Sequence, residues 1–348
     1  MKIASFFSGC GGMDLGFKNA GFDVIWANDN AANVWETFEY NFPETQLSKA
    51  SIKKIAPDDI PQVTGVIGGP PCQSWSNAGS GRGILDQRGI LFFDFIKIIK
   101  EKQPLFFVAE NVEGLLAERN KTSYDLILVN LKAAGYNVTP VVLNGADYGV
   151  PQNRKRIFFV GYRGDLDLDF HFPEPQQAKV TVKDAIYDLK DNAIPSLPFN
   201  QSNYDNCAVA NHEYWRGTYS YIFMSRNRVL SWDAQSYTIQ ASGRQVSIHP
   251  QAPEMVKVAK DVRIFKPGFE HLYRRLSVRE CARIQTFPDD FKFIYNSLDA
   301  GYKMIGNSVP VNLSNAIAVK IATDLKGVLN PNRCEQNMDL RLLANAPR

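Results

Sequence analysis

Short apolar runs alternate with stretches of helical spacing from the start of this chain to about residue 160. The runs at 63–67, 105–109 and 157–160 are typical of buried strands. Residues 94–101 have the apolar spacing of a packed helix. Strands that alternate with helices favour a parallel sheet with helical crossovers. The sequence therefore predicts an α/β fold for this part of the chain.

The pattern changes between residues 164 and 198, where prolines, aspartates and loop residues replace it. We interpret this stretch as a hinge into a second, smaller lobe. Residues 331–348 have no clear period, so we expect a tail without fixed structure at the end of the chain.

Composition excludes several classes of protein. At 348 residues, 45% hydrophobic and 22% charged, the chain is long enough for one large core and a smaller lobe. No apolar run approaches the length of a membrane span. The five cysteines have no pairwise spacing, so we expect a reduced, cytoplasmic protein without a metal template.

The positive charge is unevenly distributed. The net charge is +3, yet residues 201–285 hold 12 Lys and Arg against 7 Asp and Glu, a local +5 that leaves −2 for the remainder. A basic lobe suits a polyanionic partner, because phosphate neutralisation supplies most sequence-independent affinity. Basic faces are also often only solvated, which is the alternative explanation.

Two motifs supply a candidate nucleophile and a candidate acid. Residues 68–73 (Gly-Gly-Pro-Pro-Cys-Gln) cannot continue the strand before them, so we expect Cys72 on a loop at its carboxyl end. Glu110 follows the second run directly. The carboxyl ends of strands in an open parallel sheet form the crevice where ligands bind, so the two side chains can share a pocket. A buried thiol and a cap carboxylate are the alternative.

A glycine-rich turn at residues 6–12 (Phe-Phe-Ser-Gly-Cys-Gly-Gly) leads into a helical stretch at 13–20. Such a turn lets the backbone approach a ligand, and the helix start offers amides to a carboxylate or phosphate. A strand at 23–27 ends near Asp29, which can accept from ribose hydroxyls. S-adenosylmethionine satisfies both features. The spacing is not that of the dinucleotide motif, and an ordinary turn with a helix cap is the alternative.

Two further motifs are ambiguous when taken alone. Residues 152–156 (Gln-Asn-Arg-Lys-Arg) lead into a strand, where alternation sends Arg154 and Arg156 to the same side. Such a run is usually a solvated basic turn. Residues 306–310 (Gly-Asn-Ser-Val-Pro) precede a helical stretch at 313–325 and by themselves indicate a helix start.

In this order the motifs resemble those of bacterial-type DNA cytosine-5 methyltransferases. The resemblance runs from about residue 3 to about residue 326 and includes the block at 274–280 that leads to Gln-Thr-Phe-Pro at 285–288. More narrowly, residues 223–228 and 240–245 resemble the recognition region of the modification methylases that read GGCC.

The resemblance implies a fold and a domain division. We expect a Rossmann-like S-adenosylmethionine-dependent methyltransferase domain and a smaller target-recognition domain of mostly irregular and β structure. The helix after Pro310 would return to the first domain. The predicted domains are residues 1–180 with 285–328, residues 181–284, and a disordered tail at 329–348.

The resemblance also assigns catalytic roles. Cys72 would attack carbon 6 of cytosine, and Glu110 would protonate ring nitrogen 3 and hold the exocyclic amino group. Arg154 and Arg156 would supply positive charge, the second at the carbonyl oxygen of the base. A base must leave the duplex for this chemistry, at a cost of a few kcal/mol. The glycine-containing loop at 74–89 is expected to close over the DNA.

Binding residues follow from the same resemblance. Residues expected to bind S-adenosylmethionine lie in the glycine turn, at strand ends and in the 306–310 motif: Phe7, Ser8, Gly9, Cys10, Gly11, Gly12, Asp29, Asn30, Ser51, Ile52, Pro71, Leu91, Asn307, Ser308 and Val309. Those expected to contact double-stranded DNA are Gln73, Ser76, Ile222 as a wedge between base steps, and Arg226, Arg228 and Arg244 as readers of guanine. A core position for Ile222 and a phosphate clamp for the arginines are the alternatives.

Two positions depart from the family pattern. Asp29 stands where a glutamate is usual, and Ser51 stands where an aspartate normally accepts from the adenine amino group, which puts cofactor affinity in doubt. A monomer that is paired with a restriction endonuclease is expected. A transfer-RNA cytosine methyltransferase and a catalytically silent DNA-binding regulator are the rival functions, although a silent regulator should have lost Cys72 or Glu110.

Overall fold

The computed structural model describes residues 1–71 and 87–328. Its first half forms a seven-stranded sheet with the order β3-β2-β1-β4-β5-β7-β6. The strands are β1 (Lys2–Phe6), β2 (Asp23–Asn28), β3 (Gln46–Ser48), β4 (Gly65–Gly68), β5 (Phe106–Val112), β6 (Tyr136–Asn144) and β7 (Lys155–Arg163). All of β4 is buried. Burial on both faces explains why such strands appear in the sequence as continuous apolar runs.

Strand direction differs from the expectation at one position. β3, β2, β1, β4 and β5 are parallel, but β7 runs antiparallel to both of its neighbours, β5 and β6. The sequence pattern predicted only parallel strands up to residue 160. Residues 145–154, which join β6 to β7, contain a 3-10 turn but no crossover helix, and a parallel pair needs a longer crossover. The α/β fold class is confirmed.

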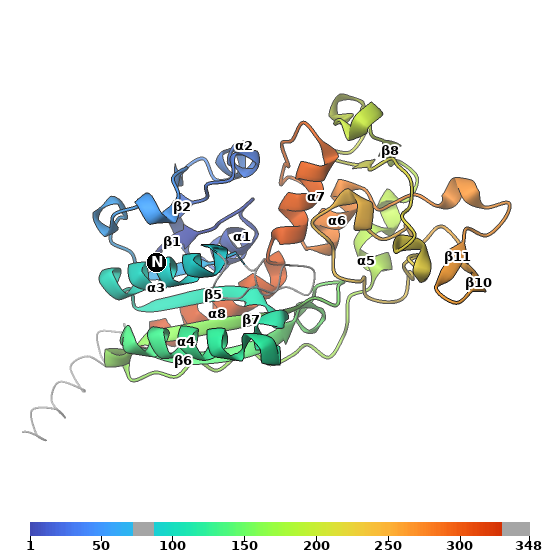
Figure 1. Cartoon of the computed structure of the whole chain (residues 1–348). Helices are drawn as coiled ribbons and strands as arrows, with labels where there is room; N and C mark the ends of the chain where they lie inside the picture. The colour runs from blue at the N-terminus through green and yellow to red at the C-terminus, as the bar shows by residue number, and fades with distance from the viewer. Residues whose placement is uncertain (72–86, 329–348) are drawn as a thin grey trace, which may run out of the picture.

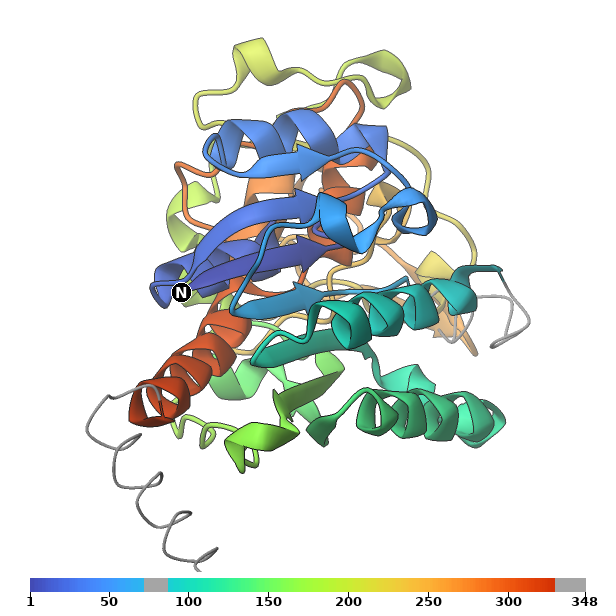
Figure 2. The same ribbon diagram turned by 90° about the vertical axis from the view of Figure 1, so that its left-hand side faces the viewer.

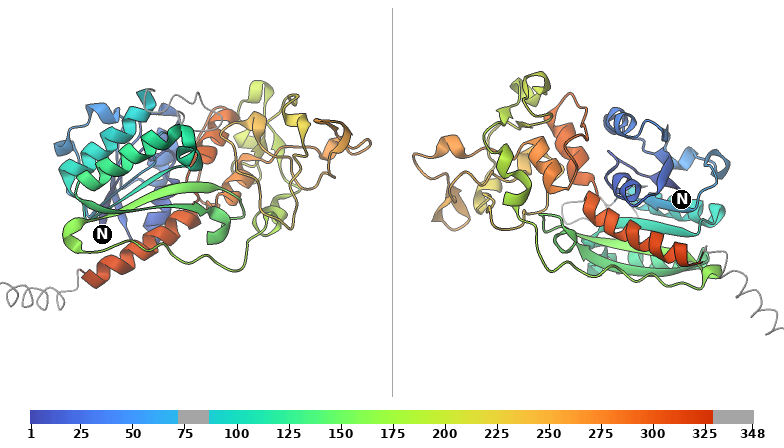
Figure 3. Two further views of the ribbon diagram at one scale, coloured as in Figure 1. Left: turned by 60° about the horizontal axis from the view of Figure 1, so that its bottom comes forward. Right: turned by 180° about the vertical axis from the view of Figure 1, so that it is seen from behind.

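Helices cover both faces of the sheet (Figures 1 and 2). One face packs against α3 (Gln87–Lys102) and α4 (Lys121–Ala133). The other packs against α1 (Gly12–Asn19) and α8 (Val311–Val328), and Figure 3 shows α8 lying across the sheet when the molecule is seen from behind. The side chain of Ser314 donates to the carbonyl of Met13 over 2.8 Å, which joins α8 to α1.

The second lobe has little regular structure. Its helices are α5 (Val182–Ile186), α6 (Val278–Ile284) and α7 (Leu298–Asn307). Its strands form two small sheets, one of β8 (Ile194–Pro195) with β9 (Glu213–Tyr214) and one of β10 (Val256–Ala259) with β11 (Val262–Ile264). The 3-10 turns η11 (Phe223–Ser225) and η12 (Gly243–Gln245) lie on the two segments that were predicted to read DNA.

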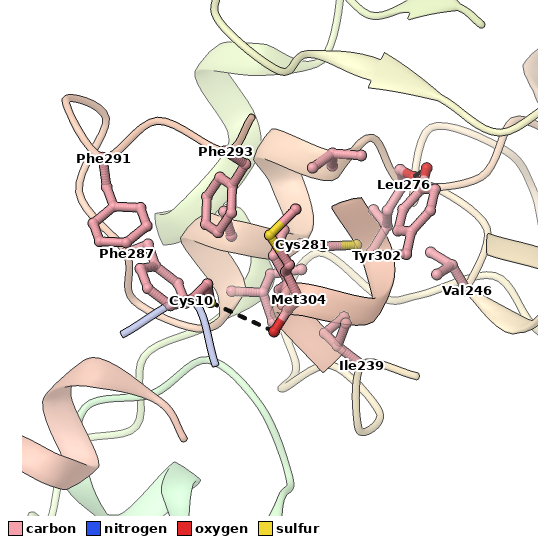
Figure 4. Close-up of a cluster of buried hydrophobic side chains, with 14 of the residues drawn as sticks. Cys10, Ile239, Val246, Leu276, Cys281, Phe287, Phe291, Phe293, Tyr302 and Met304 are labelled. Atoms are coloured by element: carbon pink, nitrogen blue, oxygen red, sulfur yellow. Dashed lines mark hydrogen bonds between the residues drawn. The ribbon is translucent and has the colours of Figure 1, made fainter. Parts of the chain in front are cut away.

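A continuous apolar cluster connects the lobes (Figure 4). It joins the helix α2 (Ala32–Asn41) and Cys10 of the first lobe to α5, α6 and α7. The thiol of Cys10 donates to the carbonyl of Met304 on α7 over 3.6 Å. Because this cluster belongs to both lobes, it gives no boundary at residue 285, and the domain division stays a prediction.

Two properties concern the described residues alone. None of the helices within 1–71 and 87–328 is long and apolar enough to cross a membrane. Within the same ranges, no group of three His, Cys, Asp or Glu side chains is placed to hold a metal ion.

The close approach of aromatic rings to glycines in the sheet gives a stability prediction. A Cβ atom on Gly161 of β7 would lie 2.1 Å from the ring of the fully buried Phe107. Gly161→Ala should therefore lower the free energy of unfolding by about 1–3 kcal/mol, measured by urea denaturation. Val129→Ala, at an exposed position on α4, is the control and should change the free energy of unfolding by less than about 0.5 kcal/mol. Equal losses in both variants would contradict the packing argument.

Candidate functional site

A cavity of about 350 Å³ lies at the carboxyl ends of β1, β2, β4 and β5. All the residues predicted to bind the cofactor line it except Gly11 and Gly12. Gly11 instead packs on Phe42, whose ring would lie 2.2 Å from an added Cβ, and a Cβ on Gly12 would lie 1.9 Å from Ser308 Oγ. These two glycines therefore allow close packing around the turn. The binding role of the lining residues stays a prediction.

The glycine turn has the backbone conformation that its sequence requires. Gly9 and Gly11 have φ values of 57° and 93°, which side chains disfavour. Phe7 shares this left-handed region at φ 53°. The amide of Gly11 donates to the carbonyl of Ser8 over 2.9 Å, and α1 begins at the next residue. Met13 and Asp14, in the first turn of α1, line the cavity, so free amides at this helix start can receive an anionic group.

Asp29 is tied to this turn. One carboxylate oxygen accepts from the amide of Gly9 at 2.9 Å and the other accepts from the amide of Ala31 at 2.8 Å. Burial raises the pKa of Asp29, while these amides and the nearby Lys303 act in the opposite direction. A carboxylate has more acceptor sites than two amides use, so Asp29 can still accept from hydroxyl groups of a ligand.

Ser51 occupies a segment that Asn28 fixes. The side-chain amide of Asn28 donates to the carbonyls of Ser48 and Ala50 at 2.9 and 2.8 Å. Ser51 then precedes the 3-10 turn Ile52–Lys54, and both Ser51 and Ile52 line the cavity. The serine that stands where an aspartate was expected therefore borders the cavity.

Glu110 lines the cavity and forms an ion pair with Arg156. Arg156 Nε lies 3.0 Å from Glu110 Oε1, and both side chains are largely buried. Burial raises the pKa of Glu110, although Arg156 and Arg154 act to lower it. Asn111 donates to the carbonyl of Pro70 over 3.3 Å, which fixes the 68–71 turn beside Glu110. A carboxylic acid with a raised pKa beside a fixed cation can donate a proton and hold a polar ring.

Arg154 joins segments that are far apart in the sequence. Its guanidinium group is 1% exposed and donates to the carbonyls of Ile239, Gly306 and Ser308 at 3.4, 2.8 and 3.0 Å. These bonds connect the 239 segment to the 306–308 turn. The positive charge of Arg154 also acts to lower the pKa of Glu110, and the catalytic role of Arg154 stays a prediction.

The predicted DNA contacts in the second lobe are largely at its surface. Ile222 is 75% exposed, which excludes the alternative of a core residue. Arg226 and Arg244 are exposed. Arg228 is half-buried and donates from Nε to the carbonyl of Phe223 at 3.0 Å and from Nη2 to that of Ile222 at 3.2 Å. These two hydrogen bonds within its own turn fix the direction of the Arg228 side chain.

Some lining residues were missed, and some predicted ones lie elsewhere. Asp14, Lys303 and Met304 line the cavity. Asp14 carried a signal, since a carboxylate on the buried face of a predicted helix is unusual. Lys303 and Met304 lie on α7 and carried none. Cys72, Gln73, Ser76 and most of the predicted 74–89 loop lie outside the described residues, as does the 329–348 tail.

Comparisons with known proteins agree with one another. A family model described as C-5 cytosine-specific DNA methylase matches residues 1–323. The chain is 53% identical over 328 residues to the type II methyltransferase M.FnuDI of Fusobacterium nucleatum, covering 93% of this chain and 95% of that one. It is 54% identical over 330 residues to the type II methyltransferase M.MthTI of Methanothermobacter thermautotrophicus, covering 95% and 99%.

Solved structures show the same fold. A candidate DNA modification methyltransferase encoded within an E. coli prophage has a TM-score of 0.73 at 25% identity, covering 94% of this chain and 99% of that one. The Entamoeba histolytica methyltransferase EhMeth has a TM-score of 0.70 at 17% identity, with the same two coverages. The second likeness concerns the fold alone.

The buried carboxyl group of Asp14 predicts a pH dependence of stability. Burial raises its pKa to about 7 from an ordinary value near 4. The native state therefore binds more protons than the unfolded chain between these values, and stability should fall as the pH rises through this window. Asp14→Asn should remove roughly 2–3 kcal/mol of the difference between pH 5 and pH 8, measured by urea unfolding. Asp23→Asn, on an exposed position, is the control, and an equal effect there would contradict the assignment.

Proposed function

The chain belongs to the C-5 cytosine-specific DNA methylase family, and on this premise we propose that it methylates cytosine within GGCC in duplex DNA through a covalent adduct with Cys72. One observation carries the proposal. The Glu110–Arg156 pair faces the 68–71 turn, and the next residue in the sequence is Cys72. A Cβ on Gly69 would lie 3.4 Å from Glu110 Oε2, so the acid and the turn are immediate neighbours.

The chemistry requires these residue types together. Carbon 5 of cytosine is a poor nucleophile, and attack of the Cys72 thiolate on carbon 6 would push electrons into the ring. Proton donation from Glu110 to ring nitrogen 3 makes the addition easier, and the raised pKa of Glu110 keeps more of the acid form available near neutral pH. Arg156 would donate to the carbonyl oxygen of the base. Once carbon 5 has received the methyl group, loss of its proton would expel the thiolate and restore the ring.

The cavity suits S-adenosylmethionine. Its volume of about 350 Å³ falls within the roughly 300–1,000 Å³ of small-molecule sites. The first amides of α1 would receive the carboxylate, Asp29 would accept from the ribose hydroxyls, and Ser51 would face the adenine. When bound, S-adenosylmethionine supplies a methyl group on a sulfonium centre. The other residues that line the cavity would hold the cofactor and exclude water.

The second lobe supports a DNA substrate. Ile222 is apolar and exposed, which suits a wedge that would fill the space left by a flipped base. Exposed Arg226 and Arg244, with the oriented Arg228, supply guanidinium forks that match the acceptors of guanine. The relatives are named type II methyltransferases, so we propose that the chain protects DNA from a partner restriction endonuclease and acts as a monomer.

The nucleophile can be tested with plasmid DNA and labelled S-adenosylmethionine. The wild-type protein should block cleavage by restriction enzymes that are sensitive to methylation of GGCC, and should leave transfer RNA unlabelled. Cys72→Ala should abolish transfer while DNA binding persists, because the thiolate acts only after the base is in the pocket. DNA with 5-fluorocytosine should trap a covalent adduct with the wild type alone. Methylation by Cys72→Ala would refute the mechanism.

Sequence reading can be separated from phosphate binding. If Arg226, Arg228 and Arg244 read guanine, each change to Ala should cost about 1–3 kcal/mol on GGCC duplexes and little on scrambled duplexes. Binding isotherms at several salt concentrations provide the measurement. A uniform loss on all sequences, with a salt slope reduced by about one, would instead identify phosphate contacts.

A further inference from the structure

Arg275 is a buried cation in the recognition lobe that the proposed reaction does not use. It lies between β11 and α6 and is 1% exposed. Its Cζ lies 4.0 Å from the ring centre of Tyr219, 4.6 Å from that of Trp215 and 5.4 Å from that of Phe223. Burial lowers its pKa. Three aromatic faces thus replace water around this guanidinium group.

Its hydrogen bonds join two separate segments of the chain. Arg275 donates to the carbonyls of Gly217 and Thr218, both at 3.3 Å, and to that of Arg244 at 3.5 Å. Its backbone also forms a bridge with Ile248. The first segment continues into η11 and Arg228, whereas the second contains η12 and Arg244. One side chain therefore spans both segments that were predicted to read DNA.

The ring of Phe223 contacts both Arg275 and Arg228. Its ring packs against both guanidinium groups, with Cζ of Arg228 at 4.9 Å and Cζ of Arg275 at 5.4 Å from the ring centre. Arg228 also donates to the carbonyl of Phe223. The position of the Arg228 fork is therefore set by a ring that Arg275 helps to hold.

We propose that Arg275 is a positioning residue for sequence recognition, which sets the distance and direction between the guanidinium groups of Arg228 and Arg244. It acts through the ring of Phe223 on one side and the carbonyl of Arg244 on the other. It does not touch DNA, because it is buried. This inference rests on the proposed reading roles of Arg228 and Arg244.

The chain offers a matched control. Arg279 is also fully buried in this lobe, and it donates to the carbonyls of Ala210, Pro288 and Phe291 at 2.9, 3.1 and 2.9 Å. These carbonyls lie outside the two reading segments. Replacing either arginine by lysine keeps the charge but removes the planar fork. A purely structural role predicts the same outcome for both changes.

The test compares Arg275→Lys with Arg279→Lys in the full chain. The quantity measured is the ratio of dissociation constants on scrambled and recognised duplexes, together with the melting temperature. The recognised sequence is first fixed with the wild type on plasmid DNA, so a site other than GGCC leaves this experiment valid. Arg275→Lys should lower the ratio by about tenfold, whereas Arg279→Lys should change the melting temperature and leave the ratio within about twofold. An unchanged ratio in Arg275→Lys would overturn the proposal.

A double-mutant cycle tests the route. If Arg275 acts partly through Arg244, the two single changes should not be independent. The factor by which the ratio of dissociation constants falls in the double variant Arg275→Lys with Arg244→Ala should then be smaller than the product of the factors in the two single variants. Multiplicative losses would overturn the route. If Arg228→Ala and Arg244→Ala leave the ratio unchanged, the proposed reading roles fail as well. If Arg275→Lys does not fold, Phe223→Leu tests the same link, and an unchanged ratio there would also overturn the proposal.

Discussion

The hydrogen bonds of Arg154 connect the start of β7, the segment around Ile239 and the turn at 306–308. From the start of β7, this side chain binds the carbonyl of Ile239 in the recognition lobe and those of Gly306 and Ser308 at the cavity. Gln152 reinforces the junction, since it accepts from the amide of Ile239 and donates to Gln285. A Cβ on Gly306 would lie 2.5 Å from the amide nitrogen of Ala241, so the two segments meet backbone to backbone. The segment at 239–241 and the turn at 306–308 are therefore held in a fixed position relative to each other.

As the hydrogen bonds between strands do in the first lobe, arginine side chains hold backbone segments together in the second lobe. With two short sheets and brief 3-10 turns, most of its backbone carbonyls lack a ladder partner, and buried carbonyls need donors. Arg275 and Arg279 supply several donors each to carbonyls that are far apart in the sequence. Arg274 donates to the carbonyl of Lys190. It also forms two hydrogen bonds with Glu280, which accepts from the amide of Ser277 at the start of α6. Side chains thus fix loops that regular structure does not.

The sequence predicted part of the sheet because its central strands depend on local signals. Apolar runs indicated β2, β4, β5 and β7, whereas β3 and β6 were not predicted, and a cavity lies where β1, β2, β4 and β5 end. The direction of β7 was missed because an extended apolar run looks the same in either direction. Alternation placed Arg154 and Arg156 on the same side of a strand, but it gave no indication that Arg154 bonds to carbonyls of distant segments. Lys303 and Met304 were missed because their contact with the cavity depends on how α7 docks.

The position of Arg154 also bears on the acid. The proposed mechanism needs a proton on Glu110, and an adjacent positive charge favours the ionised form of a carboxyl group. Burial outweighs that effect and leaves the pKa of Glu110 raised, with Arg156 in direct contact at 3.0 Å and Arg154 contributing from further away. A second direct guanidinium partner would shift the balance toward the carboxylate. Arg154, which holds the two lobes together through backbone carbonyls, therefore also influences the pKa of Glu110.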